Sequence, residues 1–343
     1  MMRRLPLLAA AMAMVSLLAA GAAILTMYDP RAVARAMEGA DLSLLGWAIV
    51  VGAAGQVLRA QRLAVMTRRH HRVSLEQAFG ARVLSHAVSS VVPLGPACMG
   101  LEGLLLRRLA GLPLAYSAGV VVACGVLDHL SIIPLLTLVL LAMHLPGWMR
   151  LLLLGALLHS VLSLVLPLLA AATRSRLGRL APRPGWRGKL LGTIRQAEDG
   201  LAVIVSGGWR IAVSAAALSL LLAAMSLLRL ALLLGAFELS PSPHQLVLLV
   251  LLGGMLGSVP IQLPGASAWA TGKLLRLIHV LGPGASAFVL VSSVMGVVET
   301  PLLALGLLLW WALPHSRVSM RLSELVALAQ ESRSERPSGA DVA

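Results

Sequence analysis

Charged residues are scarce in this sequence: Asp, Glu, Lys and Arg make up 12% of its 343 residues. An ordinary soluble domain contains about 25% charged residues and about 45–50% apolar residues. Here hydrophobic residues reach 58%, which is more than one soluble core can bury. These proportions exclude a conventional soluble enzyme, a coiled coil and a disordered chain, and they indicate an integral membrane protein.

Cysteine and aromatic residues are also few, and each shortage excludes a class of site. The two cysteines, Cys98 and Cys124, are isolated within apolar sequence, so we predict neither a disulfide framework nor a metal site. Aromatic residues make up 3% and are rarely interleaved with basic residues, which argues against nucleic-acid binding. The net charge of +14 comes mostly from short segments between apolar runs, which is typical of the cytoplasmic loops of membrane proteins.

Common catalytic motifs are missing as well. The sequence contains no Walker loop, no G-x-S-x-G motif and no H-E-x-x-H motif. The adjacent residues Asp128 and His129 would point about 100° apart on a helix, which is a weak basis for catalysis. We therefore expect no enzyme activity, no catalytic residues and no cofactor.

Long apolar runs occupy most of the chain, and runs of about 20 residues are long enough to cross a bilayer as helices. We predict an all-α polytopic membrane protein with about six spanning helices. The expected spans are 5–27, 42–58, 112–143, 151–173, 209–237 and 285–313. The first run exceeds the usual signal-peptide core of about 7–15 residues, so we expect it to be retained.

Basic residues determine the expected orientation and the domain limits. They cluster before the first span, at 59–72, at 174–195 and in the tail, whereas 28–41 mixes both signs and is expected to be an external loop. Because cytoplasmic loops carry most Lys and Arg, we place both termini in the cytoplasm, with the chain in a bacterial inner membrane. Residues 1–315 form the predicted membrane domain, and 316–343 form a polar, partly disordered tail.

Two apolar segments, 74–108 and 246–281, are interrupted by proline and glycine. The first is flanked by basic residues, so both of its ends are expected on the cytoplasmic side, and the second must begin and end outside. We therefore predict two re-entrant helical hairpins of opposite polarity, with breaks near Pro93 and near Pro264 and Gly265. The alternative is that each segment crosses the membrane with proline kinks, which gives about eight spanning segments.

A charge inside an apolar run costs about 2.5–3.5 kcal/mol and needs a partner or a function, and six residues are the candidates for such a role. They are Glu102, Asp128, Arg229, Lys273, Arg276 and Glu299. The side chains of Asp128 and Glu299 are too short to reach the membrane surface, so we predict that they pair with buried bases. The basic residues either extend to the outer interface or bind a lipid phosphate, with the acids as their partners when no lipid is bound.

Four short motifs follow one another between about residues 40 and 313. They are Leu58–Arg59–Ala60–Gln61–Arg62, Pro93 followed by Gly100, Glu102 and Arg107, Leu127–Asp128, and Pro260–Gly265. This ordered set resembles the lysylphosphatidylglycerol synthase transmembrane, flippase-like family. The resemblance implies that a substrate-binding site also includes Arg59, Arg62, Pro93, Arg107, Pro264 and Gly265.

The chain departs from the family pattern at several points. Leu101 separates Gly100 from Glu102, and the acid expected after the second proline break is absent from Gly265–Thr271. The arginine expected in the last helix is not evident, whereas Glu299 is present there. Because only 314–343 follow the last apolar run, we expect the soluble aminoacyl transferase domain of the bifunctional synthases to be missing.

Broken apolar segments in corresponding positions are typical of transporter sites. With the intramembrane charges, they favour translocation of a lipid or lipid-linked precursor across the inner membrane without ATP hydrolysis. The expected partner is an amphiphilic lipid of the phospholipid, polyprenyl-linked or hopanoid type. Two alternatives stay open: a membrane-embedded lipid-modifying enzyme that uses Asp128, His129 and Glu102, and a scaffold for lipid-biosynthesis enzymes that dock on 174–195.

Overall fold

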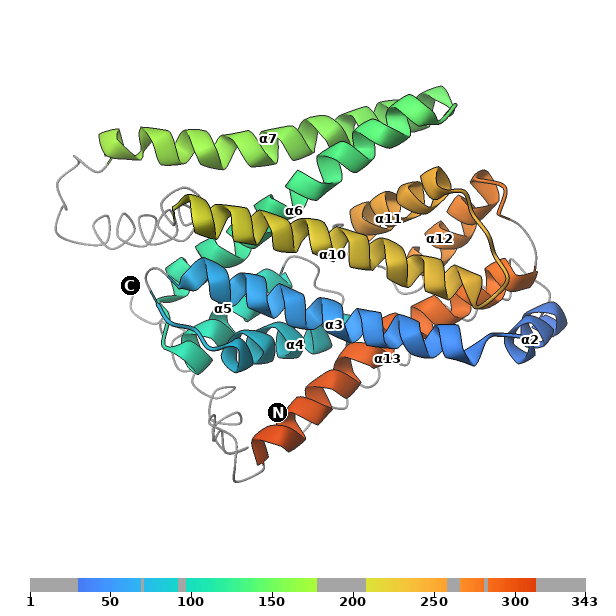
Figure 1. Ribbon diagram of the computed structural model, residues 1–343, viewed down its shortest axis with the longest axis horizontal. Coiled ribbons are helices and arrows are strands. Elements are labelled where there is room, and N and C mark those ends of the chain that lie inside the picture. The colour runs from blue at the N-terminus through green and yellow to red at the C-terminus, as the bar shows by residue number, and fades with distance from the viewer. Residues whose placement is uncertain are drawn as a thin grey trace, which may run out of the picture.

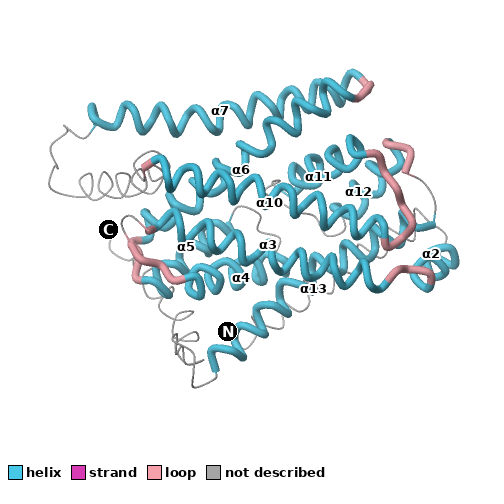
Figure 2. The backbone as a smooth tube through the Cα atoms, viewed as in Figure 1, coloured by secondary structure: helices cyan, strands magenta, loops and turns pink. Residues whose placement is uncertain are grey.

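The computed structural model describes residues 30–68, 71–91, 97–177, 208–257, 266–280 and 283–312. Within these ranges every regular element is a helix, as Figure 2 shows, so the all-α prediction is confirmed. The predicted first span 5–27, most of the basic segment 174–195 and the tail 316–343 lie outside the described residues.

Among the described residues, five helices are long and apolar enough to cross a membrane. They are α3 (Leu42–Thr67), α6 (Leu114–Ala142), α7 (Gly147–Leu177), α10 (Trp209–Gly235) and α13 (Pro283–Ala312). These helices match five of the six predicted spans. Large apolar side chains on them are exposed, such as Leu141 (82%) and Leu151 (72%), and extensive apolar surface of this kind faces lipid. The chain is therefore a polytopic membrane protein.

Two pairs of shorter helices lie between the long ones. The first pair is α4 (Leu75–Val91) with α5 (Ala97–Ala110), and the second is α11 (Pro243–Gly257) with α12 (Ala266–Leu277). The longest of the four, α4, has 17 residues. Its length is about 26 Å, which is less than the roughly 30 Å of a bilayer core.

These two pairs have the arrangement that was expected of re-entrant hairpins. The helices of each pair pack against each other, and in Figure 1 the two pairs enter the bundle from opposite ends. This arrangement matches the opposite polarity that was predicted for the two hairpins. The predicted breaks near Pro93 and Pro264 lie outside the described residues.

One element differs in detail from the sequence predictions, and the predicted span 112–143 forms a single helix. Within the predicted external loop, Pro30–Glu38 form a helix, α2. Proline suits the first position of a helix because its φ is already helical and its missing N–H would have no partner there. α6 is one continuous helix of 29 residues that passes through Pro134. Its length of about 44 Å requires a tilt in a bilayer, and α6 runs obliquely in Figure 1.

The base of the first hairpin is closed by three hydrogen bonds. At the start of α4, the backbone N–H of Ser74 donates to Gln77 Oε1 (3.0 Å) and that of Gln77 donates to Ser74 Oγ (3.2 Å), which is a capping box. The side-chain amide of Gln77 also donates to the carbonyl of Leu109, near the end of α5 (2.7 Å). We call this set of bonds the Ser-x-x-Gln clasp.

The second hairpin has the same clasp. The backbone N–H of Ser242 donates to Gln245 Oε1 (2.7 Å), and that of Gln245 donates to Ser242 Oγ (3.4 Å). The side-chain amide of Gln245 donates to the carbonyl of Ile278, just after α12 (2.8 Å). In both hairpins the clasp fixes the register of one arm against the other.

The long helices α3 and α10 lie side by side near the middle of the bundle (Figure 1). α3 also packs against α4 of the first hairpin, and α10 packs against α11 of the second. Side chains on α3 and α10 therefore reach both hairpins, and the charges on these two helices lie close to the centre of the protein.

Candidate functional site

Five charged side chains surround a small chamber of about 90 Å³. They are Arg59 and Arg62 of α3, Arg82 of α4, Glu102 of α5 and Asp128 of α6. We call this cavity the charged chamber. Arg59 and Arg62 reach it together because residues three apart share one face of a helix. The other three side chains are brought there by the packing of α4 on α3 and of α5 on α6.

Arg62 is the most extensively bonded of these charges. The residue is 4% exposed, and its Nη1 and Nη2 donate to the two carboxylate oxygens of Asp128, with 3.2 Å between Nη2 and Oδ2. Nη1 also donates to Ser219 Oγ of α10 (2.7 Å). Two-point pairing of arginine with carboxylate is a strong, charge-assisted interaction. The predicted pairing of Asp128 is confirmed, and the pair links α3, α6 and α10.

A second ion pair joins the two arms of the first hairpin. Arg82 Nη1 donates to Glu102 Oε2 at 2.8 Å, and Glu102 is 4% exposed. Arg82 is not among the site residues that the sequence predicts. The proline break was the available signal, because a chain that turns back near residue 93 brings positions such as 82 and 102 side by side.

Arg59 differs from the other arginines of the chamber. Within the described residues its side chain makes no hydrogen bond or ion pair, and it lies on the wall that the chamber shares with a larger groove. The buried Nε atoms of Arg62 and Arg82 also donate no hydrogen bond within that part of the chain. With three arginines and two carboxylates, the chamber has a formal charge of +1. It therefore suits one further anionic group.

The larger groove, which we call groove A, has a volume of about 680 Å³ and is walled mainly by α6, α7, α10 and α11. Arg59 and Asp128 line both groove A and the charged chamber, so the two cavities adjoin. Hydroxyl and imidazole groups line part of groove A: Ser131, His129, His159, Ser160, Ser219 and Ser226. The rest of its wall is mostly aliphatic, and such a combination suits an amphiphile.

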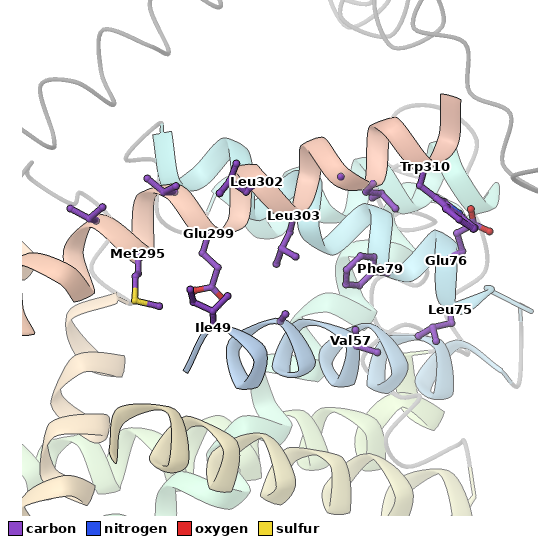
Figure 3. Close-up of a pocket in the computed structure, with 15 residues that line it drawn as sticks. Ile49, Val57, Leu75, Glu76, Phe79, Met295, Glu299, Leu302, Leu303 and Trp310 are labelled. Atoms are coloured by element: carbon purple, nitrogen blue, oxygen red, sulfur yellow. The ribbon is translucent and has the colours of Figure 1, made fainter. Parts of the chain in front are cut away.

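A second groove of about 940 Å³, groove B, lies between α3, α4 and α13 (Figure 3). Apolar side chains form nearly all of its wall, and Glu76 and Glu299 are its ionisable residues. In Figure 3 Glu299 points from α13 toward α3, whereas Phe79 and Trp310 lie farther along the groove near Glu76. The indole N–H of Trp311 donates to Glu76 Oε1 (2.9 Å).

Arg229 of α10 pairs with Glu299 beside groove B, with Nη2 donating to Oε2. α3 passes this pair at Gly52, where a Cβ atom would collide with Glu299 Oε1 and lie 3.1 Å from Arg229 Cζ. These atoms are the ends of two flexible side chains, so glycine lets the backbone of α3 pass the ion pair without shifting it. The predicted pairing of Glu299 is confirmed, and the pair joins α10 to α13.

Replacement of Gly52 by alanine is expected to lower the free energy of unfolding by about 1 kcal/mol, the low end for overpacking, because the flexible ends of Arg229 and Glu299 must shift. The measurement is unfolding of the purified protein in detergent. Gly55→Ala is the matched control on the same helix, since a Cβ at Gly55 meets nothing within 4 Å. Equal losses for the two variants would contradict the role assigned to Gly52.

The other predicted site residues lie elsewhere. Arg107 is exposed near the end of α5, and Lys273 and Arg276 are exposed on α12. These three line neither the charged chamber nor groove A nor groove B. Their exposure fits the interpretation in which basic side chains extend to the interface. The remaining predicted site residues lie outside the described part of the chain or of its side chains: Pro93, Pro264 and Gly265.

Residues 9–308 match a family model described as the lysylphosphatidylglycerol synthase TM region. The matched range contains both hairpins and all five charged residues of the charged chamber. No curated protein and no solved structure matches the chain significantly.

Proposed function

Because the chain belongs to the lysylphosphatidylglycerol synthase TM-region family, we propose that it moves an amphiphilic lipid or a lipid-linked precursor across the bacterial inner membrane without hydrolysing ATP. The family match and the apolar helices indicate a membrane protein of lipid-related processes. The observation that carries the proposal is the charged chamber, which has a net positive charge and adjoins groove A.

A phosphate-bearing head group is the ligand that the chamber suits best. Arginine binds phosphate oxygens with the same two-point geometry that it uses for carboxylate. A phosphate that enters from groove A meets Arg59 first. It can then accept hydrogen bonds from the buried Nε atoms of Arg62 and Arg82, which donate none within the described residues. The ion pairs with Asp128 and Glu102 stay formed, so no buried ion is left unpaired.

Groove A provides room for the lipid next to the chamber. Its volume of about 680 Å³ lies within the range of about 300–1,000 Å³ that is typical of ligand sites. The hydroxyl groups of Ser131 and Ser226 donate to the backbone carbonyls of Asp128 and Leu222, so their oxygens can accept hydrogen bonds from a head group. Leu135 and Leu222 offer apolar contact to the lipid chains. Phospholipids and polyprenyl-linked lipids carry a phosphate, whereas simple hopanoids do not, so these classes are separable by experiment.

The orientation that we propose places both termini in the cytoplasm. In that orientation α3 ends and α6 begins at the cytoplasmic surface, as their basic flanking residues require. Groove A then extends from the charged chamber toward the external leaflet, because its α6 residues follow Asp128 along that helix.

Filling groove A is expected to slow lipid transport about tenfold, which corresponds to about 1.4 kcal/mol of lost lipid contact. Gly155 of α7 lines groove A, and a Cβ there meets nothing within 4 Å, so Gly155→Trp places an indole in the groove without a backbone clash. Purified protein in vesicles is tested with head-group-labelled phospholipid, polyprenyl phosphate and hopanoid probes, and quenching of the outer leaflet is followed over time.

Gly147→Trp is the matched control, because Gly147 lies on the same helix outside groove A and also has open space at its Cβ. The proposal fails if no probe crosses faster than in empty vesicles. Equal rates for Gly155→Trp and Gly147→Trp would remove groove A from the pathway.

A second candidate, a lipid-modifying enzyme within the membrane, is favoured by one contact in groove A. His129 Nδ1 lies 3.1 Å from Ser160 Oγ, a distance at which histidine activates a serine nucleophile. Asp128 does not orient this imidazole, because its carboxylate is bonded to Arg62. Mass spectrometry of the vesicle lipids separates the candidates: a product that disappears in Ser160→Ala indicates an enzyme, and unchanged lipid supports translocation.

A further inference from the structure

The two halves of the described chain share a common plan. Each half has a long helix, a clasped hairpin and a second long helix, from α3 to α6 in the first and from α10 to α13 in the second. The clasp glutamine bonds to a carbonyl 32 residues away in the first half and 33 residues away in the second. Two such clasps at corresponding positions indicate a repeated unit.

Each half also has one arginine–carboxylate pair at the same place. Arg62 and Arg229 each lie 20 residues after the first residue of their helix. Each arginine pairs with the acid on the long helix that follows its own hairpin, Asp128 on α6 and Glu299 on α13. The partners are 66 residues apart in the first half and 70 residues apart in the second.

The contacts that cross between the halves are reciprocal. Arg62 donates to Ser219 of α10, and Arg229 lies against Gly52 of α3. Ser219 precedes Arg229 by 10 residues, and Gly52 precedes Arg62 by the same interval. Each arginine thus meets the equivalent position of the other half, as in two units that are related by a two-fold axis.

Equivalent positions also line the two grooves. Asp128, Ser131 and Leu135 line groove A from α6, and Glu299, Leu302 and Gly306 line groove B from α13 at the same spacing. α6 and α13 run in opposite directions in Figure 1. From the two ion pairs, groove A therefore extends toward one end of the bundle and groove B toward the other.

We infer that residues 42–142 and 209–312 are inverted structural repeats, and that groove B is the counterpart of groove A, a second site for the same amphiphilic lipid in the opposite leaflet. The inference rests on the proposed function. Inverted repeats give a carrier two related states. In passing from one state to the other, the two repeats exchange their conformations.

The two ion pairs are the contacts that change between these states. Both pairs are formed and both grooves are present in the described structure; separation of Arg62 from Asp128 widens groove A further, and separation of Arg229 from Glu299 widens groove B. The movements are coupled because α3 and α10, which carry the two arginines, pack along each other. Widening of one groove is therefore expected to narrow the other.

The two grooves differ in the side chains that would contact the head group and the hydrocarbon chains of a lipid. Groove A carries hydroxyl and imidazole groups, whereas groove B is apolar beyond its two acids, and Gly52 replaces the hydroxyl of Ser219. The chemistry of groove B fits the acyl or isoprenoid chains of the lipid. The head group then remains beside the Arg229–Glu299 pair.

Cysteine labelling in vesicles tests whether the grooves open alternately. In a variant with Cys98→Ala and Cys124→Ala, a reporter cysteine replaces Ser131 in groove A or the equivalent Leu302 in groove B. A water-soluble maleimide is used, since it reacts only where water reaches the thiol. Asp128→Asn is expected to raise Ser131→Cys labelling at least threefold and to lower Leu302→Cys labelling by a similar factor.

Glu299→Gln is expected to have the opposite effect at both reporters. The control is Arg150→Gln, an exposed position on α7 that should change neither reporter. Changes of the same sign at both reporters, or a change confined to the reporter beside the altered pair, would overturn the inference.

If a charge variant does not fold, distances between spin labels test the inference in a protein with both ion pairs intact. One pair of labels spans groove A at Ser131 and Ser226, and another spans groove B at Val57 and Leu302. Each pair is expected to show a long and a short distance whose populations shift in opposite directions when anionic phospholipid is added. Populations that shift together would overturn the inference.

Neither measurement requires lipid to cross the membrane. The results can therefore refute the proposed function or the second site in groove B independently of each other. Reciprocal opening without lipid transport would retain the inverted repeats and refute the proposed function. Lipid transport without reciprocal opening would retain the proposed function and refute the second site in groove B.

Discussion

Asp128→Ala is expected to lower the free energy of unfolding by about 3 kcal/mol, because it leaves the guanidinium of Arg62 buried without its counter-ion. Removal of one partner from a buried ion pair costs about 3–5 kcal/mol. Arg62 is 4% exposed, and the hydroxyl of Ser219 is the acceptor that remains in the described structure. The Asp128 side chain is 47% exposed toward the cavities, which is why we expect the low end of that range.

Equilibrium unfolding in mixed detergent micelles measures this loss. The matched control is the double variant Arg62→Met with Asp128→Leu, which removes both charges and is expected to recover most of the stability. A loss below about 1 kcal/mol for Asp128→Ala, which is the value of an exposed ion pair, would show that the pair is not a buried structural link.

Arg59→Glu is expected to reduce transport of a phosphate-bearing lipid about 100-fold. The substitution changes the formal charge of the chamber from +1 to −1 at the residue that a head group meets first. The lost charge-assisted hydrogen bonds are worth about 1.5–3 kcal/mol, and about 2.7 kcal/mol corresponds to 100-fold in rate. Because Arg59 makes no ion pair within the described residues, its loss removes no partner from another side chain.

The vesicle assay with labelled phospholipid measures this effect, and Arg150→Glu is the control for charge reversal at an exposed position on α7. A hopanoid probe without phosphate is expected to be much less affected by Arg59→Glu than a phospholipid probe. If the Arg59→Glu protein transports the phospholipid at the wild-type rate, the charged chamber is excluded as the site that binds the head group.

The spanning helices could be predicted because the thickness of a bilayer determines how long an apolar helix must be. The predicted span 209–237 coincides with α10 to within two residues at each end. α3 is the instructive exception, since its predicted end at residue 58 falls short of Thr67. Arginine is costly in lipid, but the helix continues because Arg62 pairs with Asp128 inside the protein.

The partners of the intramembrane charges could not be predicted from the sequence. A charge within an apolar run shows that a partner is needed, but the partner depends on how helices are rotated and crossed. Arg62 and Asp128 are 66 residues apart and lie on helices separated by an entire hairpin. The capping box at Ser74 and Gln77 is a local pattern, whereas its bond to Leu109 exists only once the hairpin has formed.

Each clasp joins the two arms of its hairpin at their base, so the arms are expected to rotate together about that base. Because Gln77 ties the start of α4 to Leu109, and Gln245 ties the start of α11 to Ile278, the arms resist sliding past each other. An arm of about 26 Å converts a rotation of about 5° at its base into a displacement of about 2 Å at its tip. A small rotation of the loops at the base therefore becomes a larger displacement, with a smaller force, at the tip of the hairpin.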